Sequence, residues 1–166
     1  RNTARAEELR RELLAVAGCG DVIVAKVSLD SLDSISDFCN RIIALNRPIA
    51  AILHNAGVMC RYRSLTADGF EQSLAVNYLA PVLITHRLLP LVADGGCITF
   101  TTSITRKLHR LSEEILHEPE AKFSQLGTYG RTKLALTHYA LWLSEQVSSR
   151  RIRVNCADPG VVDTNM

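Results

Sequence analysis

Apolar and polar positions follow two different patterns along this chain, and the pattern changes from one segment to the next. Some segments repeat apolar residues every three or four positions, as on one helix face, and others hold short apolar runs, as in buried strands. The helical period predicts helices over residues 4–18, 31–45, 66–92 and 129–147. The short runs predict strands over residues 21–27, 49–54, 97–103 and 152–157. The polar stretch 106–124 predicts a loop with short helical pieces.

The predicted elements alternate strictly between helix and strand, which indicates a parallel sheet with helices on both faces. Pro81 predicts a kink in the third helix, and Gly95 with Gly96 predicts a turn before the third strand. Ligands of such sheets bind beyond the carboxyl ends of the strands. Small and polar residues gather at three of these ends, so we expect the functional site there.

Length and composition indicate one ordinary globular domain over residues 1–166. The chain is 47% hydrophobic and 22% charged, and its net charge of +2 gives no reason to expect nucleic acid or an anionic membrane as partner. The apolar stretch 72–85 is shorter than the roughly 20 residues of a membrane span, so we expect no span. Five cysteines without a CxxC motif indicate small buried side chains in a reducing, cytoplasmic compartment.

Tyr129 and Lys133 lie one helical turn apart and therefore point in the same direction. A lysine cation about 4 Å from a phenol favours the phenolate, which predicts a lowered pKa for Tyr129 and proton exchange near neutral pH. The alternative is a packed tyrosine beside a solvated lysine.

Further candidates lie at the strand ends and in the third helix. Ser103 ends a strand, where it could act on a ligand or cap the next turn. Asn77 lies in an apolar helix, where an amide must be hydrogen-bonded, so it could be structural, functional or both. Pro159 and Gly160 could bind a ligand or only shape a turn. The basic loop around Arg106 is either solvated or an anion site, and the five histidines show no metal-ligand spacing.

Taken in order, these motifs resemble those of the short-chain dehydrogenase/reductase family, most closely its retinol-dehydrogenase-like members. The motifs are N-A-G at 55–57, V-N at 76–77, the serine at 103, Y-x-x-x-K at 129–133 and P-G-x-V-x-T at 159–164. The resemblance implies an oxidoreductase that transfers a hydride between NADP(H) and a carbonyl or alcohol substrate. The alternative is a catalytically silent dinucleotide-binding or interaction protein on the same scaffold.

The resemblance also implies residue roles. Tyr129 would exchange the proton, Ser103 would hold the substrate oxygen, Lys133 would hold the nicotinamide ribose, and Asn77 would anchor a water. Arg1 favours NADP over NAD, which stays possible. Ser28 and Leu29 stand where family members usually carry an Asp-Leu pair that contacts the adenine of the cofactor. His54 stands where many family members have an asparagine before the N-A-G motif. The implied cofactor-binding residues are Arg1, Ser28, Leu29, Asn55, Ala56, Gly57, Tyr129, Lys133, Pro159, Gly160, Val162 and Thr164.

The family's glycine-rich phosphate loop has no counterpart in this sequence. We therefore expect an incomplete Rossmann-type doubly wound parallel sheet that lacks its first two strands, within a longer chain. The strand at 21–27 would have no partner, and the one at 49–54 would expose an apolar edge. A homo-oligomer is also expected, because the long helices of relatives pair across two-fold axes. The pattern does not identify the substrate.

Overall fold

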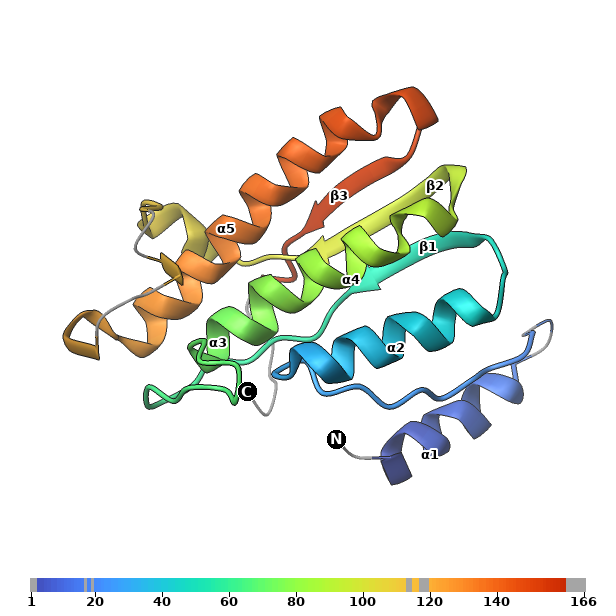
Figure 1. Cartoon of the computed structure of the whole chain (residues 1–166), viewed down its shortest axis with the longest axis horizontal. Coiled ribbons are helices and arrows are strands. Elements are labelled where there is room, and N and C mark those ends of the chain that lie inside the picture. The colour runs from blue at the N-terminus through green and yellow to red at the C-terminus, as the bar shows by residue number, and fades with distance from the viewer. Residues whose placement is uncertain (1–2, 17, 19, 113–114, 117–119, 161–166) are drawn as a thin grey trace.

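The computed structural model describes residues 3–16, 18, 20–112, 115–116 and 120–160. Its centre is a parallel sheet of three strands in the order β1-β2-β3 (Figure 1). The strands are β1 Ile49–His54, β2 Val92–Thr101 and β3 Arg153–Ala157. His54 pairs with Phe100, which pairs with Cys156, so the carboxyl ends of all three strands meet at one edge of the sheet. The fold is a partial Rossmann-type α/β sheet, as the sequence predicts.

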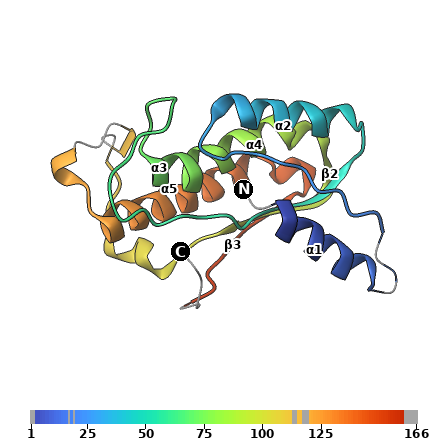
Figure 2. The ribbon, with the colours of Figure 1, turned by 90° about the horizontal axis from the view of Figure 1, so that it is seen from below.

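The helices lie on both sides of this sheet but unequally. Figure 2 shows α2, α4 and α5 together on one face, whereas α1 lies toward the other. The helices are α1 Thr3–Leu14, α2 Leu32–Ala44, α3 Gln72–Leu74, a π-helix Ala75–Leu79, α4 Ala80–Leu88 and α5 Gln125–Gln146. Short 3-10 helices lie at Leu89–Leu91, Ile104–Leu108, Glu120–Lys122 and Ser148–Arg150.

Two apolar clusters hold the helical layer on the sheet. Ile98 and Phe100 of β2 pack against Leu136 and Leu143 of α5 in the first cluster. The second lies between α2 and α4 and is formed by Ile35, Cys39, Ala80, Ile84 and Leu88. Burial of such side chains stabilises a fold by about 1.5–3 kcal/mol each, so the first cluster fixes where α5 places its polar residues.

The segment 21–27 is not assigned as a strand in this structure, but the expectation that it would lack a strand partner is confirmed among the described residues. The segment is extended, but among the described residues no strand pairs with it. Side chains bind its backbone instead: Arg10 Nε donates to Val22 O at 2.8 Å and Arg41 Nη2 to Lys26 O at 2.7 Å. A strand exists only through its ladder partner, and here arginines satisfy the carbonyl groups that a ladder would bind.

The third helix begins six residues later than 66–92 predicts, because Leu65 and Glu71 first form an antiparallel bridge. Glu71 caps the helix by accepting a hydrogen bond from the Leu74 N–H at 2.8 Å. The irregularity expected at Pro81 takes the form of a π-helix at Ala75–Leu79, just before that proline. Proline has no N–H to donate to the carbonyl four residues back, so the hydrogen-bond pattern changes there.

The two glycines at 95–96 lie inside β2 rather than in a turn before it. Gly95 has a φ of 77°, and the pairing of β1 with β2 shifts between Ile49 and Ala51. A side chain on Gly96 would meet Ala93 O at 2.8 Å. The glycines therefore form an irregularity within β2, at the position where the sequence predicts a turn.

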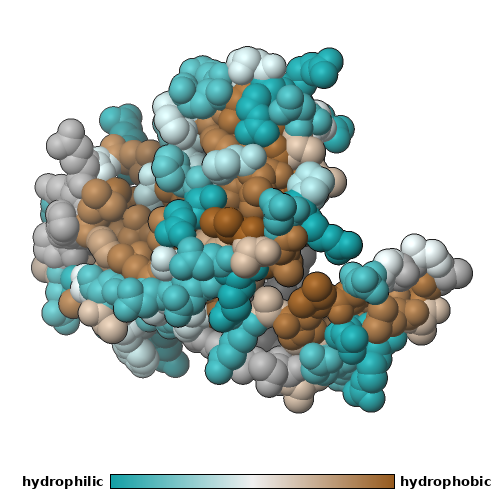
Figure 3. Space-filling model, turned by 45° about the vertical axis from the view of Figure 1, so that its right-hand side comes forward, coloured by the Kyte–Doolittle hydropathy of each residue, from teal (hydrophilic) through white to brown (hydrophobic). Residues whose placement is uncertain are grey.

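The strand β1 is not covered on both faces, contrary to the sequence prediction. Leu53 on this strand is 66% exposed. The strand β1 also lies at an edge of the sheet, so the exposed apolar edge that the sequence predicts at residues 49–54 is confirmed. Leu9, Leu13 and Leu14 are also exposed, and Figure 3 shows apolar side chains on the surface of this side of the molecule.

The helical stretch Gln72–Leu91 is long and apolar enough to cross a membrane by length and composition. This differs from the expectation from residues 72–85, because the helix continues to Leu91. Half of its most apolar window is buried, and Leu74, Ile84 and Leu88 belong to the core.

The cysteines differ in burial more than the sequence predicts. Cys39, Cys60, Cys97 and Cys156 carry free thiols, of which only Cys39 is fully buried. Cys60 and Cys97 are half-buried, and Cys156 is exposed because most of β3 is exposed. Cys19 lies outside the described residues.

Candidate active site

A cavity of about 470 Å³ lies at the carboxyl ends of the three strands. It is bordered by the segments after β1, β2 and β3 and by the first half of α5. The lining residues are Asn55, Ala56, Gly57, Thr101, Thr102, Ser103, Tyr129, Lys133, Pro159 and Gly160. The structure thus brings together eight residues that the sequence singles out. Thr101 and Thr102 were missed, although their position just before Ser103 at a strand end was the signal.

Tyr129 lies in the second turn of α5 and is 8% exposed. Burial raises the pKa of its phenol, a hydrogen bond with Ser103 lowers it, and the charge of Asp158 raises it, with a net increase. The prediction of a lowered pKa is therefore wrong for this structure. The Lys133 ammonium lies over the ring, 5.7 Å from its centroid, and donates to Thr101 O at 2.8 Å.

Lys133 is 3% exposed, and burial lowers the pKa of its ammonium to about 8. Thr101 O is the one hydrogen-bond acceptor seen for it among the described residues. An ammonium has three N–H groups, so two remain for a ligand in the cavity. Such an arrangement suits a group with hydroxyl or other acceptor oxygens.

Ser103 serves both readings of its sequence position. It begins the 3-10 helix Ile104–Leu108, and its Oγ accepts from the Thr105 N–H at 3.3 Å and from Thr105 Oγ1 at 3.0 Å. The Ser103 side chain also lowers the pKa of the Tyr129 phenol, and both side chains line the cavity. The cap therefore holds the serine oxygen on the wall of the cavity.

Asn77 is fully buried in the π-helix and binds the segment after β1. Its Oδ1 accepts from the Val58 N–H at 2.8 Å, and its Nδ2 donates to Val58 O at 2.8 Å and to Thr132 Oγ1 at 3.1 Å. Thr132 in turn donates to Tyr129 O at 2.7 Å. Asn77 thus connects two walls of the cavity.

Gly57 leaves room for the lysine and the asparagine. A Cβ at this position would lie 3.3 Å from Lys133 Nζ and 3.5 Å from Asn77 Oδ1. Asn55 is fixed on the other side by the Thr101 hydroxyl, which donates to its Oδ1 at 3.0 Å. The backbone at Gly57 is therefore close to the Lys133 ammonium, so one ligand could contact both groups.

Ser28 and Leu29 do not join this cavity. The Ser28 hydroxyl donates to Asp30, and its backbone N–H donates to Ser34 Oγ at 2.9 Å. Leu29 lines a separate apolar cavity of about 220 Å³ that shares Asn55 and Ala56 with the first. The predicted cofactor residues Arg1, Val162 and Thr164 lie outside the described residues.

Arg106 is neither a solvated cation nor an open anion site. Its Nη1 donates to Asp158 Oδ2 at 2.9 Å and to Ser103 O at 2.8 Å. Sequence reasoning gave Asp158 no role, because nothing local connects it with a residue so far away along the chain.

His54 has a structural environment. Its Nε2 lies 2.8 Å from Thr85 Oγ1, and its ring stacks on Phe100 with 5.0 Å between centroids. Burial lowers the pKa of His54 to about 4, so the ring is neutral at pH 7. Among the described residues, no group of three His, Cys, Asp or Glu side chains could hold a metal ion.

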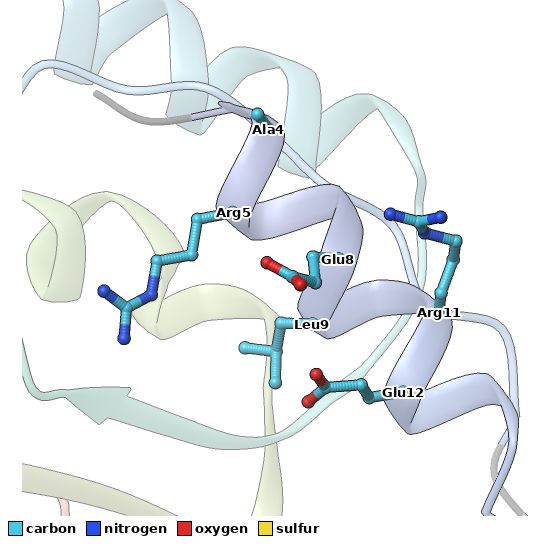
Figure 4. Close-up of a pocket in the computed structure, with 6 residues that line it drawn as sticks. All are labelled: Ala4, Arg5, Glu8, Leu9, Arg11 and Glu12. Carbon is cyan, nitrogen blue, oxygen red and sulfur yellow. The ribbon is translucent and has the colours of Figure 1, made fainter.

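Two other cavities lie elsewhere. One of about 770 Å³ is lined by a single helix, α1, whose Arg5, Glu8 and Glu12 side chains project to the same side in Figure 4. Another of about 630 Å³ lies beside α5 and includes Tyr139 and Trp142. Neither contains a residue that the sequence motifs single out.

Comparison with known proteins identifies the class of protein that this fold and site define. A family model described as enoyl-(acyl carrier protein) reductase matches residues 2–166. Polyprenol dehydrogenase of Mus musculus is 34% identical over 170 residues, which cover 98% of this chain and 50% of the relative. Retinol dehydrogenase 14 of Homo sapiens is 31% identical over 182 residues, which cover 100% of this chain and 54% of the relative.

The chain belongs to the short-chain dehydrogenase/reductase family and is similar to its retinol-dehydrogenase-like members. It spans about half the length of the curated relatives it matches. Among solved structures, the angucycline C-6 ketoreductase LanV with bound NADP has a TM-score of 0.73 and 27% identity, covering 99% of this chain and 61% of that one. A short-chain dehydrogenase/reductase from Serratia marcescens has a TM-score of 0.78, 23% identity and coverages of 100% and 63%, and supports the fold alone.

Proposed function

We propose that this chain carries the catalytic site of an oxidoreductase that transfers a hydride between NADP(H) and a carbonyl or alcohol substrate. The observation that carries the proposal is the single cavity lined by buried Lys133 and Tyr129 together with Ser103. A module that only binds a dinucleotide needs no such proton donor.

The residues of the cavity fit a nicotinamide cofactor. Gly57 brings backbone close to the Lys133 ammonium, whose free N–H groups suit the ribose hydroxyls. When bound, the cofactor supplies the hydride, and the protein supplies position and proton. Ser103 would hold the substrate oxygen beside Tyr129, and the Tyr129 phenol would give a proton to that oxygen or take one from it. Asn77 would fix the segment after β1 through Val58 and would anchor a water molecule next to Lys133.

The finer assignments are part of the same proposal. NADP is favoured over NAD by Arg1 and by the bound NADP of the similar ketoreductase LanV. A lipophilic substrate is favoured because similar proteins are named as dehydrogenases of polyprenol and retinol. Free thiols favour a reducing compartment such as the cytoplasm, and the exposed Trp142 on α5 favours a homo-oligomer.

The test follows NADPH oxidation with a panel of long-chain aldehydes and ketones. Tyr129→Phe should reduce turnover by about 10²–10⁴-fold while NADPH affinity stays nearly unchanged. Tyr139→Phe removes the same hydroxyl ten residues further along α5, outside the catalytic cavity, and should retain turnover. Equal rates for Tyr129→Phe and wild type would refute the proton-transfer role. NADPH binding without turnover of any substrate would favour the silent binding module.

A further inference from the structure

Arg106 and Asp158 form an ion pair beside the catalytic cavity, between two segments that are far apart in the sequence. Arg106 comes from the 3-10 helix that begins at Ser103, and Asp158 directly precedes the turn of Pro159 and Gly160. Both side chains are only about a quarter exposed, at 23% and 27%.

The hydrogen bonds of this pair reach the cavity on both sides. One nitrogen of Arg106 donates to Ser103 O at 2.8 Å and to Asp158 Oδ2 at 2.9 Å. The other carboxylate oxygen of Asp158 accepts from the Gly160 N–H at 3.1 Å. A continuous chain of hydrogen bonds therefore joins the backbone of Ser103 to the backbone of Gly160, and both residues line the cavity.

The pair also affects the charge around Tyr129. Asp158 raises the pKa of the phenol, because a nearby negative charge opposes a second one. Hydrogen bonding from Gly160 is the main cause that lowers the pKa of Asp158, and the charges of Arg106 and Lys107 add to it. Lys133 lies over the ring of Tyr129, and the ring of His109 lies against the neighbouring glycine at position 130, so both are further titratable groups near the phenol.

Stability alone does not account for the placement of this pair. Partly exposed ion pairs contribute about 0–1 kcal/mol to folding. The same pair between two elements remote from the cavity would stabilise the fold equally well. Its particular position is that it connects the residue that holds the substrate oxygen with the turn on the cofactor side of the cavity.

We propose that Arg106 and Asp158 are positioning residues of the catalytic site. Their ion pair sets the distance between Ser103 and the Pro159–Gly160 turn, and the guanidinium offsets part of the Asp158 charge beside the Tyr129 phenol. The inference rests on the proposed function for its kinetic part only.

The first readout is the ultraviolet titration of the Tyr129 phenolate in the protein without cofactor, taken as the difference from the same background carrying Tyr129→Phe. Arg106→Gln leaves Asp158 unpaired and should move this titration to higher pH. Asp158→Asn should move it to lower pH, and the double variant should lie between the two. A purely structural pair would change the melting temperature and leave all four titrations coincident, which would overturn the electrostatic role.

The second readout is kcat/KM with NADPH and the best carbonyl substrate as a function of pH. Arg106→Gln should lower kcat/KM about tenfold or more, because small displacements of positioned groups have large kinetic effects. Arg106→Lys keeps the charge but not the paired donation to Ser103 and Asp158, so it should restore the titration and only part of the rate. Full rate in Arg106→Gln and in Asp158→Asn would overturn the positioning role.

The two proposals fail in different ways. A wild-type protein that turns over no carbonyl refutes the proposed function, and the phenolate titration still decides the role of the ion pair. Should Arg106→Gln not fold, the opposite shift expected for Asp158→Asn remains the deciding measurement.

Discussion

Replacing Lys133 with methionine should make the folded protein more stable while removing its activity. The lysine is 3% exposed, and its pKa falls from 10.5 to about 8 on folding, because burial disfavours the ammonium. At pH 7 the ammonium is charged in both states, so this difference corresponds to about 3 kcal/mol of destabilisation. Methionine has a similar length and no charge. Losing the hydrogen bond from Lys133 to Thr101 O should cost about 1–2 kcal/mol of folding stability, so Lys133→Met should be more stable than wild type by about 1–2 kcal/mol.

The assay is urea unfolding of wild type and Lys133→Met at several pH values, with the exposed Lys26→Met as control. The pKa of Lys133 is lowered by folding, so the folded state loses its proton first as the pH rises. Wild type should therefore recover stability between pH 8 and pH 10.5, and the advantage of the variant should shrink over that window. A difference that stays constant over the window, or a variant that is less stable at pH 7, would refute the reasoning. Turnover should be lost in Lys133→Met and kept in Lys26→Met.

Two further predictions test the architecture of the site. In Gly57→Val, the added Cβ would lie 3.3 Å from the Lys133 ammonium and should displace it, so NADPH binding measured by calorimetry should weaken at least about tenfold. In the control Gly20→Ala, the added Cβ meets nothing within 4 Å, so NADPH should bind normally. Unchanged affinity in Gly57→Val would contradict the close approach. His54 is neutral when folded, with a pKa of about 4, so its contribution to stability is complete above about pH 6.5 and is lost toward pH 4, by up to about 3 kcal/mol. His54→Gln should flatten that part of the pH dependence of unfolding, and parallel curves would exclude His54 as its source.

The sequence predicts the elements that are defined by side-chain periodicity. The helix α5 and the strand β2 bury one face or both against neighbours, and that burial requires the apolar pattern. The segment 21–27 has the same apolar pattern as a strand, but strand formation also needs a hydrogen-bonded neighbour. The expected absence of that neighbour came from the order of strands in the sheet and not from any local pattern. The π-helix at Ala75–Leu79 is likewise a matter of backbone hydrogen bonding, and only Pro81 hinted at it.

The same distinction applies to the site. The strand ends and the single helical turn between Tyr129 and Lys133 place the chemistry in one cavity, and sequence spacing is enough to predict this. The pKa of Tyr129 is raised first by burial and also by the charge of Asp158, and both depend on how distant segments pack around the phenol. The ion pair of Arg106 with Asp158 joins two loops across the sheet edge, so its residues have no sequence relationship from which to predict it.

The energetic position of Lys133 supports a role in function rather than in folding. A buried ammonium with one acceptor is an unfavourable element of a core, since burial of a charge must be offset by several partners. Around it, the rest of the site is well satisfied: Asn77 makes three hydrogen bonds and Ser103 accepts two from Thr105. A frame in which Asn77 and Ser103 are hydrogen-bonded and one cation is under-satisfied is suited to a ligand whose oxygens complete it. The stability gain expected for Lys133→Met measures the free energy of folding that this arrangement costs.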